Sequence, residues 1–403
     1  MHKIILQNKI TLLTEKTNTN TIVIAVNANV GSNHESEKIF GISHFLEHML
    51  FEGTKKRPNA GIISNEIECL GGEFNAYTSN ERTLFYIRTL SKHFDTALEI
   101  ISDMVSNSIF VQEFIEKERK VILKEINMVT DEPRFHQWIL FQKALFKKHP
   151  ARNPTYGTVK TVNSISRNDL INYFRKHYSA NNLSIAVVGN FTDENKIIKN
   201  VADKFSRLKA GGANEVISAD EPEQKSPVEK IEKRSILNSY MVLGYRTPAR
   251  ETYESYVLDV VKAIFARGQS GKIVEAVRIK KGLAYEVNLL HDSNKGFGMF
   301  AVHLNSDKKN IPKIKKIIFD EFRKLKTISK NDIDIAKGFI EGHYLMDEED
   351  NFKFAEKLLF WEQIKDAKLH YDYIGTIKKV AKEDILRVAG KYINENYTMV
   401  RIE

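Results

Sequence analysis

Cysteine is nearly absent from this chain, whose 403 residues include one cysteine, Cys69. An intramolecular disulfide needs a second cysteine, and a zinc cluster of thiolates needs several, so both are excluded. Long hydrophobic runs are also missing, since no apolar stretch approaches the roughly 18 residues that cross a bilayer. The N-terminal MHKIILQNKITLLTEKT predicts two short strands and lacks the apolar core of a secretion signal. We therefore expect a cytoplasmic protein with no membrane partner.

The charge balance does not point to nucleic acid. The chain has 61 Lys and Arg against 52 Asp and Glu, a net charge of +9, and these charges are scattered through both halves. No aromatic-and-basic RNA motif and no zinc finger accompanies them. We interpret the excess as a solvated surface and predict no nucleic-acid partner. With 42% hydrophobic residues, the chain can bury a sizeable core in more than one domain.

A linker separates two similar parts of the chain. Residues 207–230 combine glycine, proline and polar residues without apolar periodicity, which is typical of a linker. On either side, RNDLINYFRKHYSANNLSIAVV (167–188) and KEDILRVAGKYINENYTMVRI (382–402) align without a gap at an offset of 215 residues. Both segments predict an amphipathic helix followed by a short strand.

The middle of each part repeats a longer pattern. FNAYTSNERTLFYIRTL with SKHFDTALEIISDMV predicts strand, turn, strand and helix, and so does YEVNLLHDSNKGFGMFAVHL with KKNIPKIKKIIFDEF. This order, found twice, predicts an α+β fold of two similar halves, each an antiparallel β-sheet with helices packed on it. We predict an N-terminal half at residues 1–210, a linker at 211–230 and a C-terminal half at 231–403.

The first half contains a pair of histidines that the second half lacks. GISHFLEHMLFEGT predicts a helix capped by Ser43. His44 and His48 are four residues apart, so one helical face can present both imidazoles to a single Zn²⁺, with Glu47 beside the metal. The corresponding helix of the second half, TYESYVLDVVKAIF (252–265), has no histidine, so this chemistry belongs to one half.

A catalytic zinc site needs three protein ligands and an open position for water. The histidine helix provides two ligands, and FIEKERKVILKEINMV (about 114–129) predicts a charged amphipathic helix that offers Glu118 and Glu125 for the third. These glutamates are seven residues apart and share one face, so one can bind the metal while the other orients a ligand. The residue pattern leaves open which does which. A solvated polar face is the alternative, and the apolar residues around the histidines favour a partly buried site.

These motifs resemble those of the insulinase-like (pitrilysin) zinc peptidases, in the branch similar to mitochondrial processing peptidase and its prokaryotic relatives. H-x-x-E-H is the inverted zinc-peptidase signature. The likeness extends over nearly the whole chain through HFLEHMLFEGT, GGEFNAYTS, ERKVILKEI, HPARNPTYGT and HYSANNLSIAVVGNF. In that family the third ligand follows the second histidine at the separation seen here, where 76 residues lie between His48 and Glu125. The resemblance thus implies that Glu125 is the third ligand and Glu118 a supporting residue.

The resemblance also implies roles for two residues of the second half. Arg278 and Tyr285 flank Gly282, where a helix is expected to give way to a strand. They match an arginine and a tyrosine with which active relatives hold substrate and stabilise the oxyanion. In relatives built from two chains this pair comes from the partner. The resemblance therefore implies a homodimer in which Arg278 and Tyr285 act across the chain interface.

FNAYTS matches the strand to which members of the family add an extended peptide. The resemblance implies that Phe74, Asn75 and Ala76 lie on an edge strand and bind substrate through main-chain hydrogen bonds. Binding of this kind depends on the backbone more than on side chains, so it suits peptides and unfolded segments enclosed in a chamber. An ordinary strand with a turn-prone asparagine is the alternative.

The sequence leads to one expected function and two alternatives. We expect a zinc metalloendopeptidase with one Zn²⁺ per chain, in which Glu47 is the general base and Glu118, Arg278 and Tyr285 complete the catalytic residues. A non-catalytic structural subunit is the first alternative, and the intact metal-binding residues count against it. A basic protein that binds nucleic acid is the second, and it would show salt-dependent binding without peptidase activity.

Overall fold

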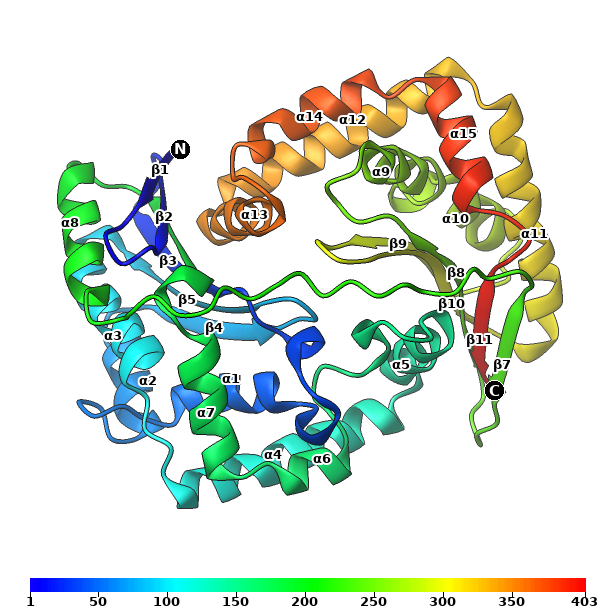
Figure 1. Cartoon of the computed structure of the whole chain (residues 1–403). Helices are drawn as coiled ribbons and strands as arrows, with labels where there is room; N and C mark the ends of the chain where they lie inside the picture. The colour runs from blue at the N-terminus through cyan, green and yellow to red at the C-terminus, as the bar shows by residue number, and fades with distance from the viewer. The chain divides into compact units, whose positions relative to one another are not determined.

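The computed structural model describes all residues from 1 to 403. The chain forms two compact units, and neither is a continuous stretch of sequence. The first unit comprises Met1–Met128, Asn153–Val216 and Asp347–His370, and the second comprises Val129–Arg152, Ile217–Met346 and Tyr371–Glu403. Each unit is built on one β-sheet (Figure 1). None of the helices combines the length and the apolar character that a membrane span requires.

The first sheet has six strands in the order β1-β2-β6-β3-β5-β4, so β4 lies at an open edge. Adjacent strands are antiparallel except β2 and β6, which are parallel. The two strands expected at the N-terminus are confirmed as β1 and β2. The strands are β1 (His2–Ile5), β2 (Thr11–Lys16), β3 (Thr21–Ala28), β4 (Glu73–Thr78), β5 (Thr83–Leu90) and β6 (Leu183–Gly189).

Helices cover one face of this sheet and enclose the larger core of the first unit. Strand residues of alternate positions, such as Leu12, Ile24 and Ile87, point into that core and meet the apolar faces of the helices. The helices of this layer are α1 (Ile42–Phe51), α2 (Ala60–Glu68), α3 (Phe94–Asn107), α4 (Gln112–Asp131), α6 (Val159–Ser164), α7 (Arg167–His177) and α8 (Glu194–Phe205).

The other face of the first sheet is covered by α13 (Asn351–Ile364), which comes from the C-terminal part of the chain (Figure 1). Leu358 of α13 packs with Val23 and Val188 of the sheet. Phe352 stacks on Tyr86 of β5 with 3.9 Å between the ring centroids. The first unit therefore depends on a helix that lies far from it in sequence.

The second sheet has five strands in the order β7-β11-β8-β10-β9, with β11 and β7 parallel and the other pairs antiparallel. Phe141 and Leu145 of α5, a helix from the N-terminal part of the chain, pack on Val242 and Val400 of this sheet. The strands are β7 (Val228–Glu232), β8 (Ser239–Thr247), β9 (Glu286–Ser293), β10 (Gly298–Ser306) and β11 (Thr398–Ile402). The helices are α5 (Pro133–Leu145), α9 (Tyr253–Phe265), α10 (Lys272–Val274), α11 (Ile311–Lys324), α12 (Lys330–Met346), α14 (Leu369–Lys379) and α15 (Lys382–Tyr392).

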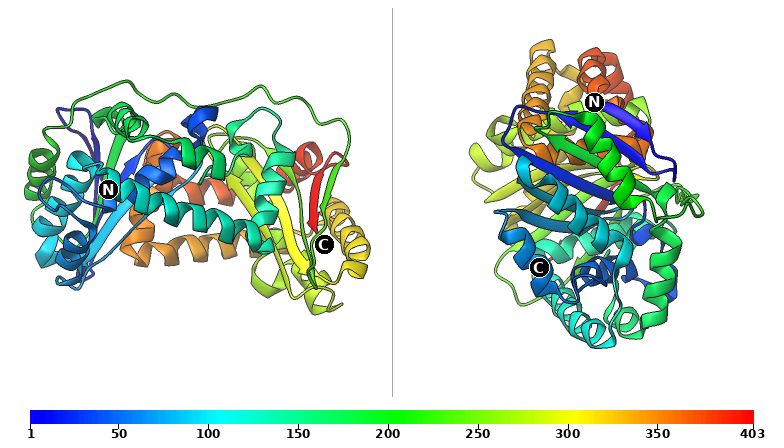
Figure 2. Two further views of the ribbon diagram at one scale, coloured as in Figure 1. Left: turned by 90° about the horizontal axis from the view of Figure 1, so that it is seen from below. Right: turned by 90° about the vertical axis from the view of Figure 1, so that its left-hand side faces the viewer.

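The α+β plan of two similar halves is confirmed. The repeated helix–strand pairs are α7 with β6 and α15 with β11, and the repeated hairpins with a helix are β4-β5-α3 and β9-β10-α11. Each sheet is antiparallel apart from one parallel pair. Residues 208–227 contain no helix or strand (Figure 2). The division of the chain at 1–210, 211–230 and 231–403 stays a prediction, and α5 and α13 each pack on the sheet of the other part.

Candidate metal centre

Two helices of the first unit, α1 and α4, bring the three predicted metal ligands together. His44, His48 and Glu125, called the ligand cluster below, place one ligand atom each within 4.8 Å of one another. The Nε2 atoms of His44 and His48 lie 3.7 Å and 3.5 Å from Oε2 of Glu125. Ligands bound tetrahedrally to Zn²⁺ at about 2.0–2.2 Å lie roughly 3.4 Å apart, so this donor set fits the ion.

Glu118 lies on α4, behind the second histidine of the ligand cluster. Its Oε2 atom is 2.9 Å from Nδ1 of His48. With the Nδ1 proton directed to this carboxylate, Nε2 of His48 faces the ligand cluster and can bind a metal once it has lost its own proton. Lys117 lies 3.4 Å from the other oxygen of Glu118 and donates to Glu52 at 2.8 Å. The positive charge of Lys117 therefore stabilises the charged form of Glu118.

Burial and neighbouring charges shift the pKa values of the two histidines in opposite directions. Burial, together with the nearby His48, lowers the pKa of His44 to about 4, so its imidazole is neutral at pH 7. Burial also acts to lower the pKa of His48, but the carboxylates of Glu118 and Glu125 outweigh it and raise this pKa to about 9. A cation bound by the ligand cluster competes with the His48 proton, so metal binding releases that proton.

Glu47 of α1 points to the neighbouring strand rather than into the ligand cluster. Its Oε2 atom accepts a hydrogen bond from Oγ1 of Thr78, the last residue of β4, at 2.5 Å. Burial raises the pKa of Glu47, although the hydrogen bond from Thr78 and the charge of His48 favour the carboxylate. A glutamate with a raised pKa beside a metal site has the properties of a general base. The sequence interpretation did not single out Thr78.

The first turn of α1 is held by Glu35, which the sequence interpretation also missed. The Glu35 carboxylate accepts the backbone N–H groups of Gly41 at 2.7 Å and of Ser43 at 2.8 Å. Gly41 is the N-cap with a φ of 93°, and a side chain there would collide with the Tyr156 carbonyl. Ser43 lies inside the helix, and its hydroxyl group contacts Tyr173 at 2.8 Å. The prediction that Ser43 caps this helix is therefore wrong.

The three residues expected to bind substrate lie on β4, at the edge of the first sheet. Phe74 packs on Phe51 of α1, with 5.6 Å between the ring centroids. Asn75 is exposed, and its side-chain oxygen accepts the backbone N–H of Ala76 at 2.8 Å. This N–H is thus not used in the pairing with β5 and faces the open edge of the sheet. A strand added at this edge can replace the Asn75 side chain as its acceptor.

Arg278 and Tyr285 lie in the second unit, between α10 and β9. Arg278 belongs to a π-helical turn at Glu275–Ile279, an irregularity that is frequent at functional sites. The guanidinium carbon of Arg278 lies 5.9 Å from the ring centroid of Tyr285, whose side chain is 82% exposed. Gly282, with a φ of 56°, provides the turn between them. The two side chains therefore contact each other on the surface of the second unit.

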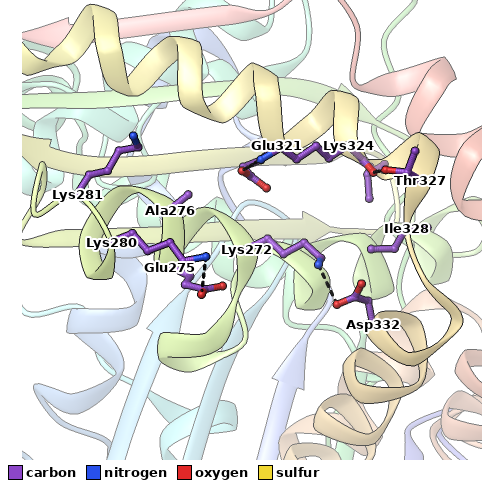
Figure 3. Close-up of a pocket in the computed structure, with 11 residues that line it drawn as sticks. Lys272, Glu275, Ala276, Lys280, Lys281, Glu321, Lys324, Thr327, Ile328 and Asp332 are labelled. Atoms are coloured by element: carbon purple, nitrogen blue, oxygen red, sulfur yellow. Dashed lines mark hydrogen bonds and ion pairs between the residues drawn. The ribbon is translucent and has the colours of Figure 1, made fainter.

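A separate cavity of about 390 Å³ lies in the second unit between α10, α11 and the start of α12 (Figure 3). Lysines line this cavity, and carboxylates of the same cavity pair with most of them. Lys280 lies 2.9 Å from Glu275, and Lys272 lies 2.8 Å from Asp332, as the dashed lines in Figure 3 mark. These internal ion pairs offset most of the positive charge that an anionic ligand would need, and no predicted site residue lines the cavity.

Known proteins resemble this chain over nearly its whole length. The model of the insulinase family (peptidase family M16) matches residues 11–159, and that of the peptidase M16 inactive domain matches residues 164–338. An uncharacterized zinc protease of Rickettsia felis is 33% identical over 95% of this chain and 90% of its own length. The chain belongs to the insulinase family of zinc proteases.

A second relative and two solved structures are also similar to this chain. The uncharacterized zinc protease YmxG of Bacillus subtilis is 28% identical over 98% of this chain and 96% of its own length. A protease from Helicobacter pylori shares the fold with a TM-score of 0.94 at 21% identity, covering 100% of this chain and 99% of that chain. A peptidase M16 inactive domain from Pseudomonas fluorescens has a TM-score of 0.90 at 19% identity, covering 100% and 97%.

The two family models fall on different parts of this insulinase-family chain. The insulinase model covers the ligand cluster, and the inactive-domain model covers the stretch that contains Arg278 and Tyr285. The helix without histidine, α9, lies in the stretch that matches the domain described as inactive.

Proposed function

We propose that this insulinase-family protein is a zinc endopeptidase that cleaves peptides or extended, unfolded segments enclosed in a chamber. The observation that carries the proposal is the convergence of the ligand cluster, with Glu47 held beside it. One Zn²⁺ per chain, bound by the cluster, supplies Lewis-acid polarisation of a water molecule and of the scissile carbonyl. The remaining steps belong to the protein's own side chains.

Glu47 is the general base of the proposed reaction. It takes a proton from the attacking water and then passes this proton to the leaving amine. One of its oxygens, Oε2, accepts the hydrogen bond from Thr78, which leaves Oε1 to carry the proton. Glu118 supports the ligand cluster through its contact with Nδ1 of His48, which fixes the tautomer of that imidazole.

The substrate lies along the open edge of β4 in this proposal. Its backbone pairs with Phe74, Asn75 and Ala76, and the N–H of Ala76 is a donor at that edge. Arg278 and Tyr285 donate hydrogen bonds to the carbonyl oxygen as it becomes an oxyanion. Because relatives built from two chains supply this pair from the partner, we place it on the second chain of a homodimer.

The activity is tested by digestion of a peptide library with the purified chain, followed by mass spectrometry of the products. We expect discrete cuts that disappear with a chelator and return when Zn²⁺ is added. Glu113→Gln, a change at the exposed start of α4, is the matched control and should cut the library normally. Cuts that persist in the chelator, or no cuts by the zinc-loaded protein, would contradict the proposal.

The action of Tyr285 across the dimer has a separate test. Glu47→Gln and Tyr285→Phe are each expected to be inactive, and the two proteins are mixed under conditions that exchange subunits. In a mixed dimer, one zinc site has its own Glu47 and receives Tyr285 from the other chain, so activity should return. If mass spectrometry shows mixed dimers and no activity returns, the pair does not act across the interface.

A further inference from the structure

We infer that Thr78 is a positioning residue for the general base: its hydroxyl group holds one oxygen of Glu47 so that the other carries the proton. This inference rests on the proposed function and extends it to a residue outside the expected site. Thr78 ends β4, two residues after the proposed substrate-binding segment. Its Oγ1 atom lies 2.5 Å from Oε2 of Glu47.

The direction of this hydrogen bond follows from the neighbouring threonine. Thr83 is paired with Thr78 across the β4–β5 hairpin, and the two hydroxyl oxygens lie 3.4 Å apart. The single hydroxyl proton of Thr83 is donated to the carbonyl oxygen of Val30 at 3.0 Å, in a buried position. Thr78 therefore receives no proton from Thr83 and directs its own to the closer, charged acceptor, the carboxylate of Glu47.

The backbone around Thr78 is fixed by its surroundings. The turn that follows β4 closes with the N–H of Ser79 on the carbonyl of Arg82 at 2.8 Å. The N–H of Ser32 bonds the carbonyl of Ser79 at 3.2 Å, so the turn is docked on a second loop. The loops approach so closely at Gly31 that a Cβ atom there would lie 2.2 Å from the Ser79 oxygen. Thr78 thus offers its hydroxyl group from a rigid strand end.

A fixed donor on one carboxylate oxygen has two consequences for Glu47. The oxygen Oε1 remains available to exchange a proton with water, in one orientation. The carboxylate is also kept beside the ligand cluster, where it does not become a fourth ligand and close the position that a catalytic site leaves open. Without the hydroxyl group, the Glu47 side chain can rotate, so Oε1 loses its fixed orientation and the carboxylate can move into the ligand cluster.

The test compares three variants in which a hydroxyl group is removed or kept. Thr78→Val removes the hydroxyl group with little change of shape, and Thr78→Ser keeps it. Thr14→Val is the matched control, because Thr14 of β2 donates to a helix glutamate, Glu194, at the same 2.5 Å and lies in the same unit. We expect Thr78→Val to lower kcat by about tenfold to a hundredfold, less than loss of the base itself. KM and zinc content should stay within about twofold, and Thr78→Ser should restore most of kcat.

Crystal structures of the zinc-loaded variants give a readout that does not depend on turnover. Glu47 should occupy one rotamer in the wild type and in Thr78→Ser, and should shift or occupy several in Thr78→Val. If Thr78→Val cleaves peptides with the wild-type kcat and its Glu47 has not moved, the inference is overturned. The proposed function would then remain intact. A wild type that cleaves no peptide would contradict the proposed function, and the Glu47 rotamer would still decide whether Thr78 positions this carboxylate.

Discussion

Glu118 and His48 are joined across two helices, with Oε2 of Glu118 2.9 Å from Nδ1 of His48. The carboxylate on α4 thereby sets the tautomer and orientation of a histidine on α1. Glu118 is 7% exposed, and its other oxygen faces Lys117. The contact orients His48 toward Glu125, which lies two turns further along α4.

Removal of the Glu118 carboxylate should weaken zinc binding without abolishing it. Glu118→Ala leaves all three members of the ligand cluster in place but frees the His48 ring, so we expect a loss of about tenfold to a hundredfold in zinc affinity. Competition with a chromophoric chelator measures the change, with Glu113→Ala on the exposed start of the same helix as the control. Unchanged affinity in Glu118→Ala would show that this contact does not support the metal.

Glu125 should matter more than Glu118, because its oxygen lies in the ligand cluster itself. Glu125→Ala removes one of the three proposed ligands, and we expect the purified variant to lose its zinc on dialysis while Glu118→Ala keeps most of it. Metal analysis of both proteins side by side measures the difference. A Glu125→Ala variant that keeps zinc beside a Glu118→Ala variant that loses it would reverse the two assignments.

Glu35 should make the stability of the protein depend on pH. Burial raises the pKa of this carboxyl from its ordinary value of 4.5 to about 7, although the N–H groups of Gly41 and Ser43 favour the charge. Between these two pH values the folded state holds a proton that the unfolded state has lost. The free energy of unfolding therefore falls as the pH rises through this window, by about 3 kcal/mol from this group.

Glu35→Gln removes this titration and provides the comparison. As the pH rises from about 5 to 8, the free energy of unfolding of the wild type should fall relative to that of Glu35→Gln. Denaturant unfolding of both proteins at several pH values measures it, and the titrations that both proteins share cancel. Parallel curves for the two proteins would show that the pKa of Glu35 is not raised.

The packing of α13 on the first sheet has a direct test in stability. Leu358 is fully buried between this helix and the sheet, so Leu358→Ala should lower the free energy of unfolding by about 2–5 kcal/mol. Leu345, near the end of α12, is 49% exposed, and Leu345→Ala should change the free energy of unfolding by less than about 0.5 kcal/mol. Denaturant unfolding compares the two, and equal effects would contradict the buried position of Leu358.

Local patterns in the sequence identified most elements that carry the site. Alternating apolar residues predicted the β4–β5 hairpin, and the period of α1 placed two histidines on one face. The same alternation puts Thr78 on the face of β4 that Phe74 and Ala76 occupy, so the strand pattern contains a signal for Thr78. The second unit has the same kind of contact as Asn75 makes in β4, because the side-chain oxygen of Asn288 in β9 accepts the backbone N–H of Leu289 at 2.8 Å.

Other features depend on contacts between distant parts of the chain, which local patterns do not encode. The apolar residues of α13 are compatible with burial, but the sequence does not tell which sheet this helix covers. The cap of α1 comes from Glu35, because the loop before the helix folds back on it, and Ser43 was the wrong choice for that reason. The selection of Glu125 over Glu118 likewise came from the family resemblance, since both glutamates share one face of α4.

The general base is the centre of this account, and Glu47→Gln tests it most directly. The variant keeps the size of the side chain and the ligand cluster but removes the carboxylate that is proposed to take the proton. Peptide cleavage and zinc content are measured on the same preparation of wild type and variant. We predict zinc near one ion per chain in both proteins and a loss of at least about a hundredfold in kcat for Glu47→Gln. Cleavage by Glu47→Gln at the wild-type rate would contradict it.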